Sequence, residues 1–230
     1  MPQVLAIFPR TMINWSTIDN VLLDMDGTLL DLSFDNYFWQ QFLPMKVADH
    51  RAMTLEEAHM TVRSLSESTY GSLNWYCLDH WSERLGMDVE ALKKEVRHLI
   101  RMRPHCAEFL VWLKGMDKRI VLVTNAHPKA LAIKIEASGL HAHLKEMISS
   151  HEFALAKEND GFWEQLGDRE CIDLSRSLFV DDSLPVLECA RRSGLRSLVQ
   201  VLHPDSGNQP SDPTHFPGIV HLDELMVRGR

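Results

Sequence analysis

The sequence predicts an α/β protein, a doubly wound parallel sheet with an all-helical segment inserted after its first strand. Short continuous apolar runs alternate with segments of helical periodicity, the pattern of parallel strands joined by right-handed helical crossovers. Residues 32–102 contain no convincing strand and repeat apolar side chains at helical spacing. Three of the apolar runs end in polar clusters, and ligands of such sheets bind beyond the carboxyl ends of the strands. The sequence therefore predicts one functional edge of the sheet.

The predicted strands are continuous apolar runs, as expected for strands that are buried on both faces. They lie at residues 21–23, 119–123, 146–150, 178–180 and 197–201, and we expect the last of these to end the sheet. Helices are indicated at 106–115, at 128–139 and through Leu187 to Gly194. The polar clusters that follow the first, second and fourth runs are Asp24 with Asp26, Thr124 with Asn125, and Asp181 with Asp182.

The helical insert has recognisable start and stop signals. Thr54 with Glu57 three residues later forms a capping box, and Asp88 is a good N-cap for a further helix. A third helix is expected from Trp75 to Leu85 and should stop at Gly86. We therefore predict that residues 12–31 and 103–230 form a Rossmann-like catalytic core and that residues 32–102 form a helical cap.

Composition narrows the class of protein. Hydrophobic residues make up 45% and charged residues 24% of the 230 residues, which is ample for a buried core. The formal net charge of −8 argues against a nucleic-acid backbone or an anionic membrane as partner. The cysteines are widely spaced without a Cys-x-x-Cys pair, so they indicate neither a zinc site nor a disulfide framework but reduced thiols in the cytoplasm. No trusted export signal or spanning segment is found, and Met12 is an alternative start to Met1.

The pair Asp24 and Asp26 has two interpretations. On the same face of a continuing strand the two carboxylates would repel each other, so a positive group is expected between them. A divalent cation is the common remedy, and Gly27 would let the backbone turn towards an anion. Alternatively, Asp-Gly is an ordinary turn that ends a strand.

The polar clusters occur in the order found in haloacid dehalogenase-like phosphohydrolases, which the chain resembles. That pattern is an apolar run followed by Asp-x-Asp-Gly-Thr, a strand ending in Thr, a Lys and an acidic pair. It is matched here by Asp24 to Thr28, Thr124, Lys157, and Asp181 with Asp182. The chain departs from it at Glu158, where Pro is usual, and at Glu188, where Asp is frequent. Lys145 is the rival to Lys157.

The resemblance implies a role for each matched residue. Asp24 would be the nucleophile that forms an aspartyl-phosphate, and Asp26 would be the general acid and base. The presence of Asp26 weighs against dehalogenase chemistry, because family members that attack carbon lack it. Mg²⁺ would be held by the Asp24 carboxylate, the Asp26 carbonyl and Asp182, with Asp181 as a further ligand or acting through water. The residues implied to bind the phosphoryl group are Met25, Thr124, Asn125 and Lys157.

A narrower resemblance comes from longer stretches, among them residues 22–32, 34–39, 73–79 and 124–128. Together they are similar to the bacterial GMP/IMP nucleotidase group, which implies a 5′-nucleotidase acting on a purine nucleotide. Two further enzyme classes stay open, a phosphatase for a sugar phosphate or phosphoglycolate and a phosphoglucomutase-like phosphotransferase. A catalytically silent partner-binding protein is the remote alternative. Trp75, Tyr76 and Trp81 are expected in the core of the cap, with a base-stacking platform as the alternative. The oligomeric state is left open.

Overall fold

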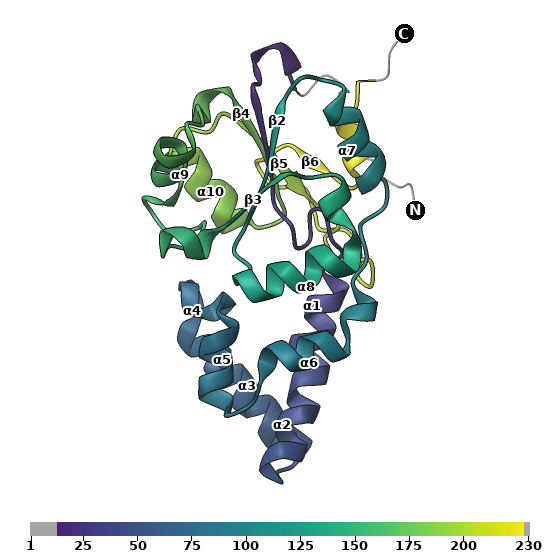
Figure 1. Ribbon diagram of the computed structural model, residues 1–230, viewed down its shortest axis with the longest axis vertical. Coiled ribbons are helices and arrows are strands. Elements are labelled where there is room, and N and C mark those ends of the chain that lie inside the picture. Colours follow the sequence, from purple (N-terminus) through teal and green to yellow (C-terminus); the bar gives the residue numbers. More distant parts are fainter. Residues whose placement is uncertain (1–12, 228–230) are drawn as a thin grey trace.

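The computed structural model describes residues 13–227 and confirms the predicted fold class. Within this range six parallel strands form one sheet in the order β3-β2-β1-β4-β5-β6 (Figure 1). The strands are β1 (Asn20–Leu23), β2 (Arg119–Thr124), β3 (Glu146–Ser149), β4 (Ser177–Asp181), β5 (Ser197–Val201) and β6 (Gly218–Ile219). Met12, which is both the alternative start and the predicted first residue of the core, lies outside the described residues.

The sheet continues beyond β5, which the sequence analysis expected to be its last strand. The short strand β6 pairs with β5 in register, with Val201 opposite Ile219. The backbone N–H of Leu202 also donates to the carbonyl of Ile219 at 2.8 Å. A strand of two residues is too short to show a period in the sequence, so only the pairing reveals it.

Two pairs of helices cover the two faces of the sheet. On one face α7 (Cys106–Lys114) and α8 (Pro128–Ser138) pack against side chains such as Leu122. On the other, α9 (Phe162–Glu170) and α10 (Leu184–Arg192) pack against Val123. Neighbouring residues of β2 thus belong to different buried clusters, as the alternation along a strand requires. Helix α9 was absent from the sequence prediction.

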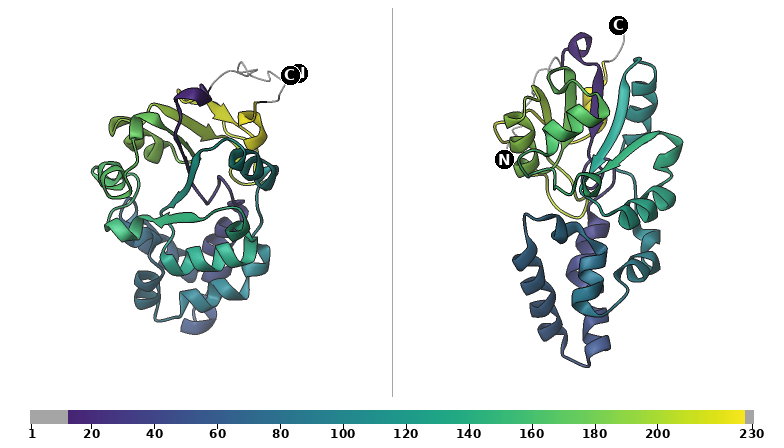
Figure 2. Two further views of the ribbon diagram at one scale, coloured as in Figure 1. Left: turned by 45° about the horizontal axis from the view of Figure 1, so that its top comes forward. Right: turned by 60° about the vertical axis from the view of Figure 1, so that its left-hand side comes forward.

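The helical insert forms a separate lobe at the carboxyl edge of the sheet, and α8 lies between the two (Figures 1 and 2). We call this lobe the cap. Its first column consists of α1 (Ser33–Tyr37), a π-helical turn (Phe38–Phe42) and α2 (Leu43–Arg51). The remaining helices are α3 (Leu55–Thr69), α4 (Leu73–Tyr76), α5 (Leu78–Leu85), α6 (Val89–Glu95) and a short 3₁₀ helix (Arg97–Leu99). The division at residues 31 and 102 stays a proposal.

The predicted signals at the ends of the cap helices are present. Thr54 and Glu57 form the capping box of α3, with the Thr54 N–H donating to Glu57 Oε2 at 2.8 Å. Asp88 caps α6 by accepting the N–H of Ala91 at 2.9 Å. Gly86 ends α5 with a φ of 70°, which glycine adopts without a Cβ penalty.

The prediction of one helix from Trp75 to Leu85 is wrong in one respect, because the helix is broken at Cys77. That residue is extended, with φ −82° and ψ 109°, and separates α4 from α5. The indole N–H of Trp81 donates to the carbonyl of Trp75 at 2.9 Å, a contact that the continuous helix would not make. No Gly or Pro marks this break in the sequence, so packing decides it.

Cap and core share buried apolar contacts. One hydrophobic cluster extends from Val21 and Leu122 in the sheet to Phe34, Phe38 and Trp81 in the cap. Trp81 is therefore a core residue of the cap, as predicted, whereas Trp75 and Tyr76 are only half-buried. None of the helices in residues 13–227 is long and apolar enough to cross a membrane.

Candidate active site

The loop that follows β1 places Asp24 and Asp26 in different surroundings. The strand ends at Leu23, and the chain then turns so that the carbonyl of Met25 accepts the N–H groups of Leu29 and Leu30 at 2.9 and 2.8 Å. The two carboxylates are therefore not displayed on one face of a continuing strand, which was the premise for expecting a cation between them.

Gly27 allows this loop to approach β4 closely. Its φ is 88°, and a Cβ built on it would lie 2.6 Å from Asp182 Oδ2. Any other L-residue would be strained there and would push against the carboxylate. The glycine of the Asp-x-Asp-Gly motif thus brings the β1 loop to the acidic pair that follows β4.

Lys157 is the cation that pairs with Asp24. Its ammonium group donates to Asp24 Oδ1, to Asp181 Oδ2 at 2.7 Å and to the carbonyl of Val123 at 3.1 Å. The lysine side chain is only 2% exposed. Burial alone would lower its pKa, but the charges of Asp181 and Asp24 prevail and raise it, so the lysine stays charged. The rival Lys145 is exposed.

The carboxylates of Asp24, Asp181 and Asp182 converge at the same edge. One oxygen from each lies within 4.8 Å of the others. Asp24 Oδ2 is buried and has no hydrogen-bond partner within residues 13–227. Burial raises the pKa of Asp24 to about 7 against the opposing charge of Lys157, and burial with the neighbouring acids raises that of Asp182 well above its usual range. Three converging carboxylates, of which one oxygen has no hydrogen-bond partner, fit a hard divalent cation such as Mg²⁺.

Asp26 is paired with a second lysine, Lys134 of α8. The Nζ of Lys134 lies 2.7 Å from Asp26 Oδ1 and 2.6 Å from Asp35 Oδ2 in the cap. Lys93 of α6 completes the network at 2.9 Å from Asp35 Oδ1. Each acid of the motif therefore has its own lysine, where the sequence prediction expected one positive group between them.

Burial sets the protonation of this second network. It raises the pKa of Asp26 to about 6, with Lys134 opposing. For Asp35 burial acts in the same direction, but Lys134 and Lys93 outweigh it and lower the pKa to about 2. Asp35 is thus a fixed charge, whereas Asp26 can exchange a proton near neutral pH.

The sequence prediction missed Lys134, although a signal for it exists. Ala130, Ile133 and Lys134 lie on the buried face of α8, and Lys134 is only 3% exposed. A lysine on the apolar stripe of a helix requires a buried partner, since an unpaired ammonium is expensive to bury. The spacing thus points to a buried acid without identifying it as Asp26.

The predicted phosphate-binding residues gather beside Asp24. Thr124 is the last residue of β2 and Asn125 follows it, and both are buried. The Asn125 Oδ1 accepts the N–H of Lys157 at 2.8 Å. The Thr124 Oγ1 accepts the N–H of Ala126 at 3.0 Å. Met25 is fully buried in the apolar cluster, so its backbone, and not its side chain, faces this edge.

Glu158 connects this group to the cap. It accepts the amide of Asn125 at 2.8 Å through Oε2 and the hydroxyl of Tyr76 at 2.8 Å through Oε1. A proline at this position, the residue usual in the resembled family, could make neither bond. Glu188, the other departure, pairs with Arg191 at 2.6 Å in α10.

Comparison with known proteins identifies the family of the chain. Residues 21–159 match the model of the haloacid dehalogenase-like hydrolases. The chain belongs to this family. It is 43% identical over 214 residues to the GMP/IMP nucleotidase YrfG of Escherichia coli (strain K12), which covers 93% of this chain and 96% of that protein. The Shigella flexneri protein of the same name shows the same identity and coverage.

Solved structures show the same fold at lower identity. A HAD phosphatase from Thermococcus onnurineus has a TM-score of 0.73 and 22% identity, over 90% of this chain and 96% of that one. The L-2-haloacid dehalogenase from Xanthobacter autotrophicus has a TM-score of 0.55 and 18% identity, over 80% of this chain and 78% of that one. The predicted enzyme class, a phosphoric monoester hydrolase, is confirmed by the family and the nucleotidase relatives.

Proposed function

We propose that the protein is a Mg²⁺-dependent 5′-nucleotidase that hydrolyses GMP and IMP through an aspartyl-phosphate on Asp24. The observation that carries the reaction is the pairing of buried Asp24 with Lys157 at the end of the central strand. The 43% identity to proteins named GMP/IMP nucleotidase supports the substrate.

Asp24 is suited to nucleophilic attack because one oxygen is held and the other is free. Lys157 binds Oδ1, while Oδ2 has no partner within the described residues. Attack forms a bond from an Asp24 oxygen to phosphorus and breaks the bond from phosphorus to the ester oxygen. Lys157, with Thr124 and Asn125 beside it, would stabilise the negative charge on the transferring group.

Asp26 would move the proton in both halves of the reaction. It would donate a proton to the departing ester oxygen and then accept one from the water that attacks the aspartyl-phosphate, releasing inorganic phosphate. Its pKa of about 6, raised by burial, supports this role because both protonation states are accessible near neutral pH.

The Mg²⁺ ion would be held by Asp24, the Asp26 carbonyl and Asp182, and would neutralise charge on the phosphoryl oxygens. Asp181 is less available as a direct ligand, since Lys157 binds its Oδ2 and the N–H of Ser183 binds its Oδ1 at 2.7 Å. We therefore assign Asp181 to the support of Lys157 and to contact with the ion through water.

The cap would select the nucleotide, because the core contacts only the phosphoryl group. Tyr76 reaches the active-site edge through Glu158, so a base bound there would lie against the α4 end of the cap. Purine preference, action in the cytoplasm and the absence of nucleic-acid or membrane partners are parts of this proposal. The four free cysteines fit a reducing compartment.

Phosphate release across a panel of substrates tests the proposal. The panel contains GMP, IMP, pyrimidine 5′-monophosphates, hexose phosphates and phosphoglycolate, each with Mg²⁺ and with EDTA. We expect the highest kcat/KM for GMP and IMP and no turnover with EDTA. Preference for a sugar phosphate or phosphoglycolate, or isomerisation of a hexose phosphate without phosphate release, would identify the alternative enzymes. Inertness towards the whole panel would favour a partner-binding protein.

A further inference from the structure

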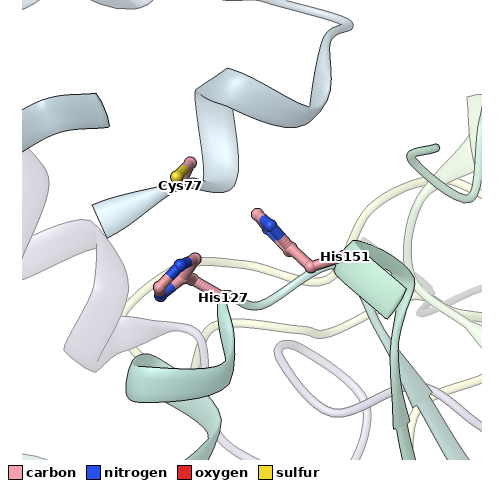
Figure 3. Close-up of side chains that lie close together, drawn as sticks. All are labelled: Cys77, His127 and His151. Atoms are coloured by element: carbon pink, nitrogen blue, oxygen red, sulfur yellow. The ribbon is translucent and has the colours of Figure 1, made fainter. Parts of the chain in front are cut away.

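Three metal-ligating side chains that the proposed reaction does not use meet between the cap and the core. Cys77 lies at the break between α4 and α5, His127 precedes α8, and His151 lies in the short 3₁₀ helix Ser150–Phe153 after β3. Figure 3 shows the thiol and both imidazole rings directed towards one space. One ligand atom from each residue lies within 4.8 Å of the other two.

The set matches the preferences of a borderline-soft transition metal. Two imidazoles and one thiolate bind zinc at about 2.0–2.3 Å, so ligand atoms around a tetrahedral ion lie about 3.5 Å apart. Small side-chain rotations would bring atoms that are already within 4.8 Å to that spacing. The oxygen cluster of Asp24, Asp181 and Asp182 is a different kind of site, suited to hard ions.

His151 is the ligand with the strongest individual signal. Its Nε2 is buried and finds no hydrogen-bond partner among the described residues, which is costly unless a ligand binds there. The imidazole rings of His127 and His151 stand edge to face, with centroids 4.9 Å apart.

His127 has outer contacts of the kind that orient a metal ligand. Its Nε2 lies 3.7 Å from Asp79 Oδ2, and the N–H of Lys129 donates to its Nδ1 at 3.4 Å. Asp79 is itself held by Lys129 Nζ at 2.6 Å. In metal sites a carboxylate that accepts the free ring N–H of a ligating histidine sets the orientation of the ring, and Asp79 is placed to do so for Nε2. The ion would replace the long contact from the Lys129 N–H at Nδ1.

We propose that Cys77, His127 and His151 bind one Zn²⁺-like transition-metal ion that ties the cap to the core and inhibits turnover. The thiol of Cys77 releases its proton to water when the ion binds, and water completes the coordination. Because Cys77 belongs to the cap and both histidines to the core, the ion holds the cap and the core in the arrangement that the structure shows. Opening of the cap for substrate entry and product release then requires a metal–ligand bond to break.

Cobalt titration tests the site without relying on activity. Reduced protein freed of metal with EDTA is titrated with Co²⁺, and we expect a thiolate-to-cobalt absorption band that saturates at one equivalent and is removed by Zn²⁺. Cys77→Ser should abolish the band, and His151→Gln should weaken Co²⁺ binding at least about tenfold. Cys171→Ser is the matched control, since Cys171 is exposed and outside the cluster, and it should keep the band.

Two outcomes would overturn the site. One is a wild-type protein that shows no thiolate band, and the other is a Cys77→Ser protein, folded by circular dichroism, that retains it. Should Cys77→Ser not fold, His151→Gln decides the matter, because unchanged Co²⁺ affinity in that variant contradicts the assignment.

Inhibition by Zn²⁺ tests whether an ion that joins the cap to the core slows turnover. With Mg²⁺ in excess, micromolar Zn²⁺ should inhibit the wild type and Cys171→Ser but not Cys77→Ser. Equal inhibition of Cys77→Ser would mean that zinc acts at the carboxylate cluster, and the inhibitory role would then be wrong. The cobalt band is independent of turnover, so its presence or absence does not depend on the proposed nucleotidase activity.

Discussion

The core and the cap hold their functional side chains in different ways. In the core, Asp24, Asn125 and Asp181 lie at or just beyond the carboxyl ends of neighbouring parallel strands, so the backbone of the sheet brings them together. The cap contributes single side chains that cross to the core from helices, among them Asp35 and Tyr76. The sheet thus fixes the relative positions of the core residues, whereas the cap adds individual polar contacts to the apolar cluster that it shares with the core.

Substitutions in the core and in the cap should therefore affect different properties of the protein. A change at the sheet edge should remove the reaction, because in the proposed mechanism the replaced group acts on the phosphoryl group itself. A change at a cap contact should alter stability or substrate affinity and leave the reaction intact. The following substitutions test the contrast, from the largest expected effect to the smallest.

Asp24→Asn should abolish turnover, with a loss of about 10⁴-fold or more, because the amide cannot serve as the nucleophile. The variant keeps the shape of the side chain and should remain folded by circular dichroism. Single-turnover phosphate release provides the measurement. Hydrolysis at a rate near that of the wild type would show that another residue carries the phosphoryl group.

Lys157→Ala should lower kcat by about 10²–10³-fold, because it removes the buried cation next to the transferring group. It should also lower the free energy of unfolding by about 3–5 kcal/mol, since Asp24 and Asp181 would be left unpaired in the interior. Lys145→Ala is the control, because that lysine is exposed. The reverse result, with damage only in Lys145→Ala, would exchange the two assignments.

Asp35→Asn should destabilise the junction of cap and core by about 3–5 kcal/mol in urea unfolding, because Lys93 and Lys134 would lose a buried charge partner. The folded-state pKa of about 2 lies below the ordinary 3.8, so the stabilisation is present above about pH 4. The difference from wild type should shrink as the pH falls from about 4 to 2. Asp49→Asn, an exposed change in α2, should show neither effect.

Tyr76→Phe should have the smallest effect, a rise in KM of about fivefold with kcat nearly unchanged. It removes only the hydroxyl that donates to Glu158, and a hydrogen bond of this kind contributes about 1 kcal/mol. Tyr70→Phe is the matched control, since Tyr70 is 72% exposed. A fall in kcat as large as that of Lys157→Ala would place Tyr76 in the chemistry and remove the contrast between cap and core.

Much of the core could be predicted because its signals are local. The apolar run before Asp24 and the run before Asp181 each identify a buried strand and the residue at its end. Parallel strands share one carboxyl edge, so the sequence predicts that their polar ends lie on the same side of the sheet, and the order β2-β1-β4 brings these ends together. The capping signals at Thr54 and Asp88 were equally local, and both were correct.

Contacts between distant helices and loops could not be predicted in the same way. The break at Cys77 is not marked by a Gly or Pro in the sequence, and the hydrogen bond across it, from the Trp81 indole N–H to the Trp75 carbonyl, is a contact of the folded chain. The pairing of Asp26 with Lys134 depends on where α8 lies relative to the β1 loop. No short motif contains either feature.

The sequence by itself determined the residues at the sheet edge, because strand periodicity is a property of the chain read in sequence, and the resemblance of its motifs to those of a known family indicated the reaction class. Only the tertiary structure decided that Lys134 pairs with Asp26, and that Cys77 meets His127 and His151. The physical reason is that a buried charged or polar side chain requires a partner, and the packing of the cap on the core determines which residue that partner is.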